Sequence, residues 1–110
     1  MQIKFTARRF RARQDLKDHA ADAVRKLDRY YDGIVTADVV LSYERVNNSV
    51  KTAEINLHVY GMVLTAKGSS NDYLKSIDSA VEKLSMRLAK YKDKLRLKDK
   101  LRVRQMNEKV

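Results

Sequence analysis

The sequence predicts an α+β domain in which a four-stranded sheet carries two helices on one face, in the order βαβββα. Apolar residues recur at steps of three and four in two long stretches, which is typical of amphipathic helices. They alternate with polar residues in four short stretches, which is typical of half-buried strands. The 110 residues include no Pro and only three Gly, so few breaks interrupt these elements. A chain of this length forms one core, and the helices are needed to cover the apolar face of the sheet.

The first strand and the first helix occupy the N-terminal third. Ile3, Phe5 and Ala7 alternate with polar residues and predict the strand. The apolar stripe of residues 14–31 predicts the helix, although no capping residue stands directly at its start. We expect Gly33 to end this helix, because glycine readily takes the left-handed conformation found at helix C-termini.

Three strands joined by tight turns follow. Residues 37–43 and 53–59 alternate between apolar and polar, and residues 62–68 form the third strand of the group. Residues 47–49 (Asn-Asn-Ser) and Gly61 are turn signals between them. Short turns between alternating strands predict an antiparallel meander with one buried face.

A long second helix completes the domain. Asn71 or Asp72 is expected to cap it, and apolar residues then follow at alternating steps of three and four as far as Leu95. The same heptad spacing would suit a coiled coil, but the sheet needs this helix as its cover. Residues 97–110 lose the stripe and are polar, so we expect a domain over 1–96 and a flexible tail after it.

The residue inventory argues against an enzyme. The chain has no Cys, which excludes disulfides, thiolate nucleophiles and cysteine metal sites. His19 and His58 stand far apart and match no metal-ligand spacing, so we expect both to be solvated. The three glycines are isolated turn residues and form no phosphate loop, and Asp22 is explained by an i,i+4 pair with Lys26. The sequence therefore predicts no catalytic residue, metal, cofactor or small-molecule substrate.

The net charge of +10 is concentrated at the two ends of the chain. Residues 1–34 carry nine basic and five acidic groups, residues 35–70 carry three of each, and residues 71–110 carry twelve and six. The charge excess therefore belongs to the helix-bearing ends, as in a scaffold that presents cationic elements to a polyanion. Neither a signal peptide nor a membrane span is evident, so we expect a cytoplasmic protein.

Four cations share one side of the second helix. On a wheel of about 100° per residue they fall within about 40° of Lys83. We call them the cationic lane: Lys83, Arg87, Lys90 and Lys94. The acidic residues fall on the other exposed flank: Asp78, Glu82 and Asp93. A helix built only for solubility would interleave signs to gain i,i+4 pairs, so this segregation favours an external polyanion over a merely solvated face.

The first helix and the loop before it carry further cations. Arg25, Lys26 and Arg29 share a face with acidic residues, so alone they indicate only a solvated surface. Beside the second helix they would widen the cationic surface. Arg8 and Arg9 begin an arginine-rich stretch that leads into this helix and could contact the same partner.

Structured RNA is the polyanion that this pattern favours. An anionic membrane would need an apolar helix face free to insert, and the core requires that face. The scattered aromatic residues are a weak signal for base stacking, whereas helix-borne cations suit recognition of RNA through its backbone. A general duplex-RNA binder and a helix-mediated oligomerisation module remain alternative interpretations.

Several runs of residues resemble the ribosome hibernation promoting factors, the ribosome-associated inhibitors of stationary-phase and stressed bacteria. In the second helix the runs are Asp72-Tyr73-Leu74, Ile77-Asp78, Ala80-Val81, Lys83-Leu84 and Lys90-Tyr91-Lys92-Asp93-Lys94. In the first helix and its exit they are Leu16, Lys26-Leu27, Tyr30-Tyr31-Asp32 and Ile34, and the turn Leu57-His58-Val59-Tyr60-Gly61 also matches. The resemblance covers about residues 1–96.

The resemblance implies a fold similar to double-stranded RNA-binding domains and a site in the mRNA/tRNA channel of the small ribosomal subunit. There the protein would contact ribosomal RNA and inhibit translation by occupancy. The matching basic positions are Lys26, Lys83, Lys90, Lys92 and Lys94. Met86 and Ala23 replace basic residues common in relatives, so contacts there are not implied. The length is similar to a short form, which would depend on a separate ribosome modulation factor, or to the N-terminal domain of a long form.

Overall fold

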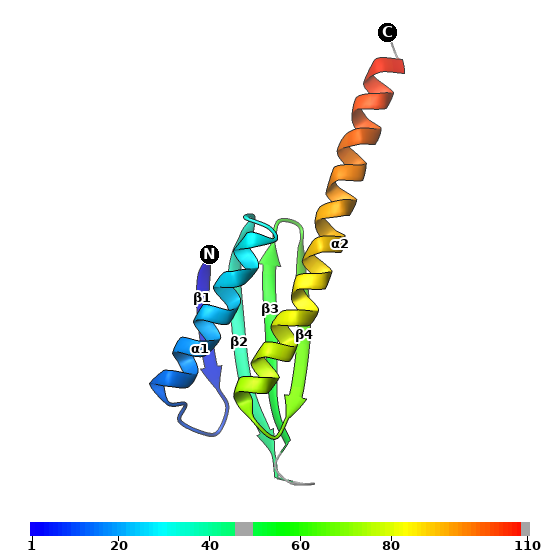
Figure 1. The fold of residues 1–110 in the computed structure, drawn as a ribbon. Coiled ribbons are helices and arrows are strands. Elements are labelled where there is room, and N and C mark those ends of the chain that lie inside the picture. The colour runs from blue at the N-terminus through cyan, green and yellow to red at the C-terminus, as the bar shows by residue number, and fades with distance from the viewer. Residues whose placement is uncertain (46–49, 109–110) are drawn as a thin grey trace.

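The computed structural model describes the backbone of residues 1–45 and 50–108, and side chains within these ranges as far as residue 97. Its elements, in chain order, are β1 (Gln2–Ala7), α1 (Gln14–Arg25), the 3₁₀ turn η1 (Lys26–Arg29), β2 (Ile34–Glu44), β3 (Val50–Val59), β4 (Met62–Ser70) and α2 (Tyr73–Glu108). The strands form one sheet in the order β1-β2-β3-β4 (Figure 1).

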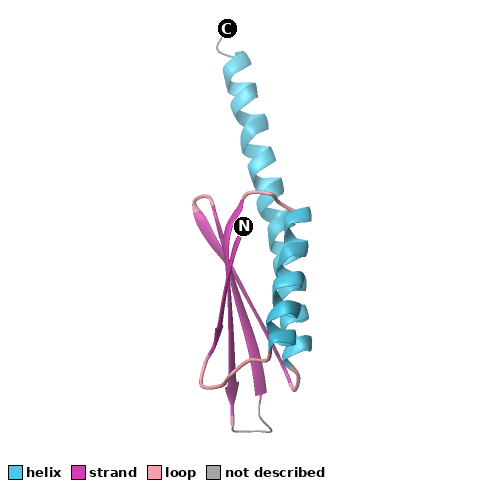
Figure 2. Ribbon diagram, turned by 90° about the vertical axis from the view of Figure 1, so that its left-hand side faces the viewer, coloured by secondary structure: helices cyan, strands magenta, loops and turns pink. Residues whose placement is uncertain are grey.

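The sheet combines one parallel pair with an antiparallel meander. β1 pairs parallel with β2, which α1 makes possible by crossing over the sheet between them. β2, β3 and β4 pair antiparallel. In register, Phe5 lies beside Val39, Val39 beside Ile55, and Ile55 beside Ala66. This row faces the helices, which both lie on one side of the sheet (Figure 2), so the predicted α+β architecture is confirmed.

The apolar stripe of α2 is used by this core. Ile77, Leu84 and Leu88 are fully buried beneath the helix. These buried side chains are not free to form an interface with another helix over this part of α2, and a coiled coil would need the same side chains at its interface. The helix covers the sheet and then continues beyond it (Figure 1).

The end of the first helix differs from the expectation. The α-helix stops at Arg25 and tightens into η1, and Gly33 is not left-handed. Within the described ranges only Arg9 and Gly61 have positive φ, at 66° and 83°. A Cβ on Gly33 would lie 2.5 Å from the Tyr31 ring. A side chain at this position would displace the Tyr31 ring, so glycine here allows the ring to pack against the backbone.

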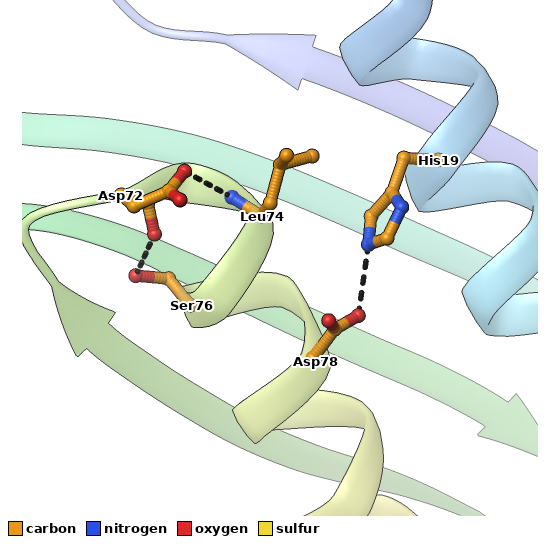
Figure 3. Close-up of polar contacts among 5 residues, drawn as sticks. All are labelled: His19, Asp72, Leu74, Ser76 and Asp78. Atoms are coloured by element: carbon orange, nitrogen blue, oxygen red, sulfur yellow. Dashed lines mark hydrogen bonds and ion pairs between the residues drawn. The ribbon is translucent and has the colours of Figure 1, made fainter.

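The start of α2 is capped by Asp72, as predicted. Its carboxylate Oδ1 accepts a hydrogen bond from the backbone N–H of Leu74 at 3.0 Å (Figure 3). The helix does not end where its stripe ends, because residues 73–108 contain neither Pro nor Gly and are rich in helix-forming residues. The described backbone is therefore helical as far as residue 108, and the flexibility expected of residues 97–110 stays a prediction. The division of the chain at 96/97 stays a prediction, and residues 109–110 lie outside the described residues.

The other two glycines have different roles. Gly61 forms the β3–β4 turn with positive φ, as its turn signal predicts. Gly68 is not a turn residue, because it lies inside β4 and faces α2. A Cβ there would overlap the carbonyl oxygen of Ser76, so α2 approaches β4 at van der Waals distance. The turn predicted at 47–49 lies outside the described residues.

Buried hydrogen bonds fasten the first turns of α2 at this close approach. Ser76 is fully buried, and its hydroxyl donates to the carbonyl oxygen of Lys51 on β3 at 2.8 Å. The Ser70 hydroxyl lies 2.8 Å from the same Oγ. These contacts fix the position of α2 on the sheet, and with it the position of every cation that α2 carries.

Candidate nucleic-acid interface

The cationic lane runs along the side of α2 that borders β4. Its first member, Lys83, donates from Nζ to the carbonyl oxygen of Lys67 on β4 at 2.7 Å. All four side chains of the lane are exposed. The Tyr91 hydroxyl donates to the carbonyl oxygen of Tyr60 in the β3–β4 turn at 2.9 Å, which marks where α2 leaves the sheet. The lane therefore begins at the sheet edge and extends to Lys94, past that point.

The acidic flank of α2 faces α1. Asp78 and Glu82 line a shallow groove between the helices, together with Lys26. His19 on α1 lies 2.8 Å, Nε2 to Oδ1, from Asp78 and joins the two helices (Figure 3). This contact corrects the interpretation of His19 as a solvated residue. It joins segments 59 residues apart, so helical periodicity within one element could not indicate it.

The cations of α1 consequently do not extend the lane directly. Lys26 is separated from the lane by this acidic groove. Arg25 pairs with Asp22 at 3.4 Å, in place of the predicted Asp22–Lys26 pair. The physical reason is that Lys26 begins the 3₁₀ turn, where side chains no longer follow α-helical spacing.

A second basic cluster forms where α2 leaves the sheet. Arg29 from the end of η1 meets Lys92 and Arg96 around one hollow, which Tyr30 and Tyr31 also line. Sequence reasoning assigned Arg29 and Lys92 but missed Arg96. On the wheel Arg96 lies about 140° from the lane, and only the packing of η1 beside α2 shows that it has cationic neighbours.

Arg8 and Arg9 lie at the opposite end of the sheet. The loop that carries them follows β1, whereas the projecting part of α2 leaves from the other end (Figure 1). Arg9 lines a hollow with Tyr43, Glu44 and Arg45. Arg8 and Arg9 therefore lie away from the second basic cluster, which forms where α2 leaves the other end of the sheet.

The described residues show no other kind of site. Among the described side chains, those of residues 1–45 and 50–97, no group of three or more His, Asp or Glu is placed to hold a metal ion. His58 is not merely solvated, since its Nε2 lies 3.1 Å from Oδ2 of Asp38 on the open face of the sheet. Over the same ranges no helix combines the length and the apolar character needed to cross a membrane.

Comparisons with known proteins agree with this architecture. Residues 3–96 match the family described as Sigma 54 modulation protein / S30EA ribosomal protein. The chain is 32% identical over 96 residues to the ribosome hibernation promoting factor of Escherichia coli (strain K12), covering 87% of this chain and 98% of that protein. It is 31% identical over 83 residues to the ribosome hibernation promotion factor of Bacillus subtilis (strain 168), covering 76% of this chain and 44% of that longer protein.

Solved structures show the same fold. The N-terminal domain of Thermus thermophilus Protein Y superposes with a TM-score of 0.73 at 28% identity, covering 83% of this chain and 99% of that one. A ribosomal subunit interface protein from Coxiella burnetii gives a TM-score of 0.77 at 22% identity, covering 84% and 99%, and supports the fold alone. With 94 of its residues matched in one continuous stretch, the chain belongs to the Sigma 54 modulation protein / S30EA ribosomal protein family.

Proposed function

We propose that this protein is a ribosome hibernation factor. It binds the small ribosomal subunit in the mRNA/tRNA channel and inhibits translation by occupancy, in the cytoplasm of stressed or stationary-phase bacteria. It is not an enzyme, and its relatives are named for ribosome hibernation and not for a reaction. The observation that carries the proposal is the cationic lane, which is exposed along the β4 side of α2 and continues beyond the sheet.

The lane has the form of a phosphate-binding surface. Its first and last cations, Lys83 and Lys94, are eleven positions apart, or about 16 Å of helix at about 1.5 Å per residue. Their mutual repulsion is relieved when phosphates lie between them, and binding releases the counterions that RNA had condensed. Such contacts position a protein on RNA without reading its sequence, which suits a factor that acts by filling a channel.

A general duplex-RNA binder is the second candidate, because a phosphate-binding lane does not by itself select ribosomal RNA. An oligomerisation module is disfavoured, because three residues of the stripe it would need, Ile77, Leu84 and Leu88, are fully buried in the core of the domain. Ribosomal RNA is the main partner in this proposal, with a ribosome modulation factor as a second partner if ribosomes dimerise.

The test replaces all four residues of the cationic lane by Glu and measures co-sedimentation with small ribosomal subunits. We expect binding to be lost while the far-UV circular dichroism spectrum is unchanged. The matched control reverses four exposed cations elsewhere, for the same change in net charge: Lys4, Lys17, Arg45 and Lys75. This control should retain most of the binding.

The outcomes separate the candidates. Competition by transfer RNA supports the channel site, whereas equal affinity for any RNA duplex favours the general binder. Affinity should fall by about 0.9 log units per tenfold increase in salt for each phosphate neutralised on a duplex. A lane variant that still co-sediments and inhibits translation would refute the assignment, as would a control that binds equally poorly.

A further inference from the structure

The hollow of the second basic cluster combines features that the cationic lane lacks. It has a volume of about 360 Å³, within the range of small-molecule sites, and lies where α2 passes the end of η1. Its chemistry comes from three cations, two tyrosines and one carboxylate: Arg29, Lys92, Arg96, Tyr30, Tyr31 and Asp32. A surface that bound only phosphates would need neither the aromatic rings nor the carboxylate.

One tyrosine is a fixed wall of this hollow. The Tyr31 ring packs edge-on against Tyr91, with centroids 5.4 Å apart and an interplanar angle of 86°. The ring also lies against the backbone of Gly33, where no side chain intervenes, and Tyr31 packs against the hydrophobic core. Tyr91 is itself held by its hydrogen bond to Tyr60. Burial, and then the neighbouring Tyr31, raise the pKa of Tyr91, so its phenol stays a neutral donor.

The other tyrosine offers an open ring. Tyr30 follows directly after η1 and is 47% exposed, although its backbone N–H is fixed by the carbonyl oxygen of Leu27 at 3.0 Å. A rigid backbone with a half-exposed aromatic ring is the arrangement on which bases stack, because every nucleobase has a π face. The ring therefore provides a stacking platform at the edge of a cationic hollow.

The charges around this platform suit a nucleotide. Among residues 1–45 and 50–97, none of Arg29, Lys92 and Arg96 forms an ion pair with a carboxylate. Their donors are placed to contact a phosphate and its neighbours along a strand. Asp32 accepts hydrogen bonds, and amino groups on the Watson–Crick edges of adenine, cytosine and guanine are the matching donors.

We infer that this hollow holds one unstacked nucleotide of the bound RNA, with its base on Tyr30, its phosphate on the three cations, and an amino group of the base on Asp32. The inference rests on the proposed function, since ribosomal RNA is the polyanion concerned. It adds a site for single-stranded RNA to a lane that contacts only the backbone. The stacking contact on Tyr30 should add no salt dependence, because stacking releases no counterions, whereas the phosphate contacts of the lane and of the hollow do.

The experiment measures the affinity of Tyr30→Leu for small ribosomal subunits at several salt concentrations. We expect binding about tenfold weaker at every salt concentration, with an unchanged slope. Tyr60→Leu is the matched control, because Tyr60 is 89% exposed in the β3–β4 turn and lies outside the hollow. It should bind like the wild type. Tyr30→Phe keeps the ring and should restore binding, which distinguishes lost stacking from a folding defect.

A second arm uses single-stranded hexamers of A, C and U as probes. The wild type should prefer the A and C hexamers over the U hexamer, because uracil has no amino group. Asp32→Ala should bring the ratio of A- and C-hexamer affinity to U-hexamer affinity close to one. This ratio is informative even if the loss of a negative charge changes the affinity for all three hexamers. Tyr30→Leu should weaken all three.

The outcomes distinguish the inference from the proposed function. If Tyr30→Leu binds subunits like the wild type while the lane variant does not bind, the inference fails and the proposed function stands. If the wild type does not bind small subunits, the proposed function fails. The hollow is then tested by the hexamers alone, and hexamer binding that is weakened by Tyr30→Leu would still support it as a nucleotide site. Equal binding of all hexamers by the wild type and Asp32→Ala would overturn the role of Asp32.

Discussion

Replacing Gly68 by Ala tests whether the close approach of α2 and β4 holds the domain together. The new Cβ would overlap the carbonyl oxygen of Ser76 and lie 3.0 Å from both the backbone nitrogen of Ala80 and the Cβ of Ser79. Two of these three neighbours are backbone atoms of a helix, which cannot rotate away as a flexible side chain can. The strain must be relieved by moving α2 away from the sheet.

The magnitude follows from the contacts that this movement disturbs. Overpacking a well-packed interface typically costs about 1–3 kcal/mol. Moving Ser76 also weakens its hydrogen bond to Lys51, and a buried hydroxyl left unsatisfied costs about 1–3 kcal/mol more. We therefore expect a loss of about 2–6 kcal/mol, with a middle value of about 4 kcal/mol, against a total stability of about 5–15 kcal/mol for a typical domain.

The assay is equilibrium unfolding in urea followed by far-UV circular dichroism. With a slope of about 2 kcal/mol per molar urea, the midpoint of Gly68→Ala should fall by about 2 M. Gly61→Ala is the matched control, because a Cβ there meets nothing within 4 Å and only the positive φ of 83° is strained. That control should lose about 1–2 kcal/mol. A Gly68→Ala variant no less stable than Gly61→Ala would refute the reasoning.

Two further changes test the strained loop and a buried phenol. Arg9 has a φ of 66°, which costs a residue with a Cβ about 1–2 kcal/mol. Arg9→Gly should therefore raise the free energy of unfolding, measured in urea titrations, by about 0.5–1 kcal/mol, and it should lower the affinity for small subunits. An unchanged free energy of unfolding would contradict the strain. Burial, and then the neighbouring Tyr43, raise the pKa of Tyr73 in the folded state above its usual value of 10.0. As the pH rises, the unfolded chain therefore releases this proton before the folded chain does, and the free energy of unfolding decreases above about pH 10. Tyr73→Phe should show a shallower alkaline decline in urea midpoints, and a decline as steep as that of the wild type would argue against the shift.

Periodicity predicted the elements that bury apolar surface, because each element's own sequence encodes which face is buried. The alternation of residues 53–59 becomes β3, and the stripe that includes Ile77, Leu84 and Leu88 becomes the buried side of α2. Asp72 was predictable for the same reason, since a cap acts on the residues directly after it. Local patterns therefore determined the order, type and facing of the elements.

The sequence could not predict features that depend on two elements meeting. Gly68 has no turn to form and is required only because α2 packs on β4 there. His19 has a partner on the other helix, and Arg96 gains cationic neighbours only where η1 packs beside α2. The end of the first helix was misjudged for a related reason, because the packing of Tyr31 on Gly33 replaces a left-handed cap.

Under the proposed function, the separation of the two cationic surfaces constrains how RNA would be bound. The lane lies beside β4, and the hollow at Tyr30 lies on the η1 side of the same helix, so one strand of phosphates cannot run straight through both. Asp78 and Glu82 occupy the groove between the helices and would repel a backbone that crossed it there. RNA that contacts both surfaces must therefore pass around the projecting part of α2, beyond the sheet, where the acidic groove has ended. A folded RNA with an unstacked nucleotide beside a backbone turn meets this requirement, whereas a regular duplex presents no free base to the hollow.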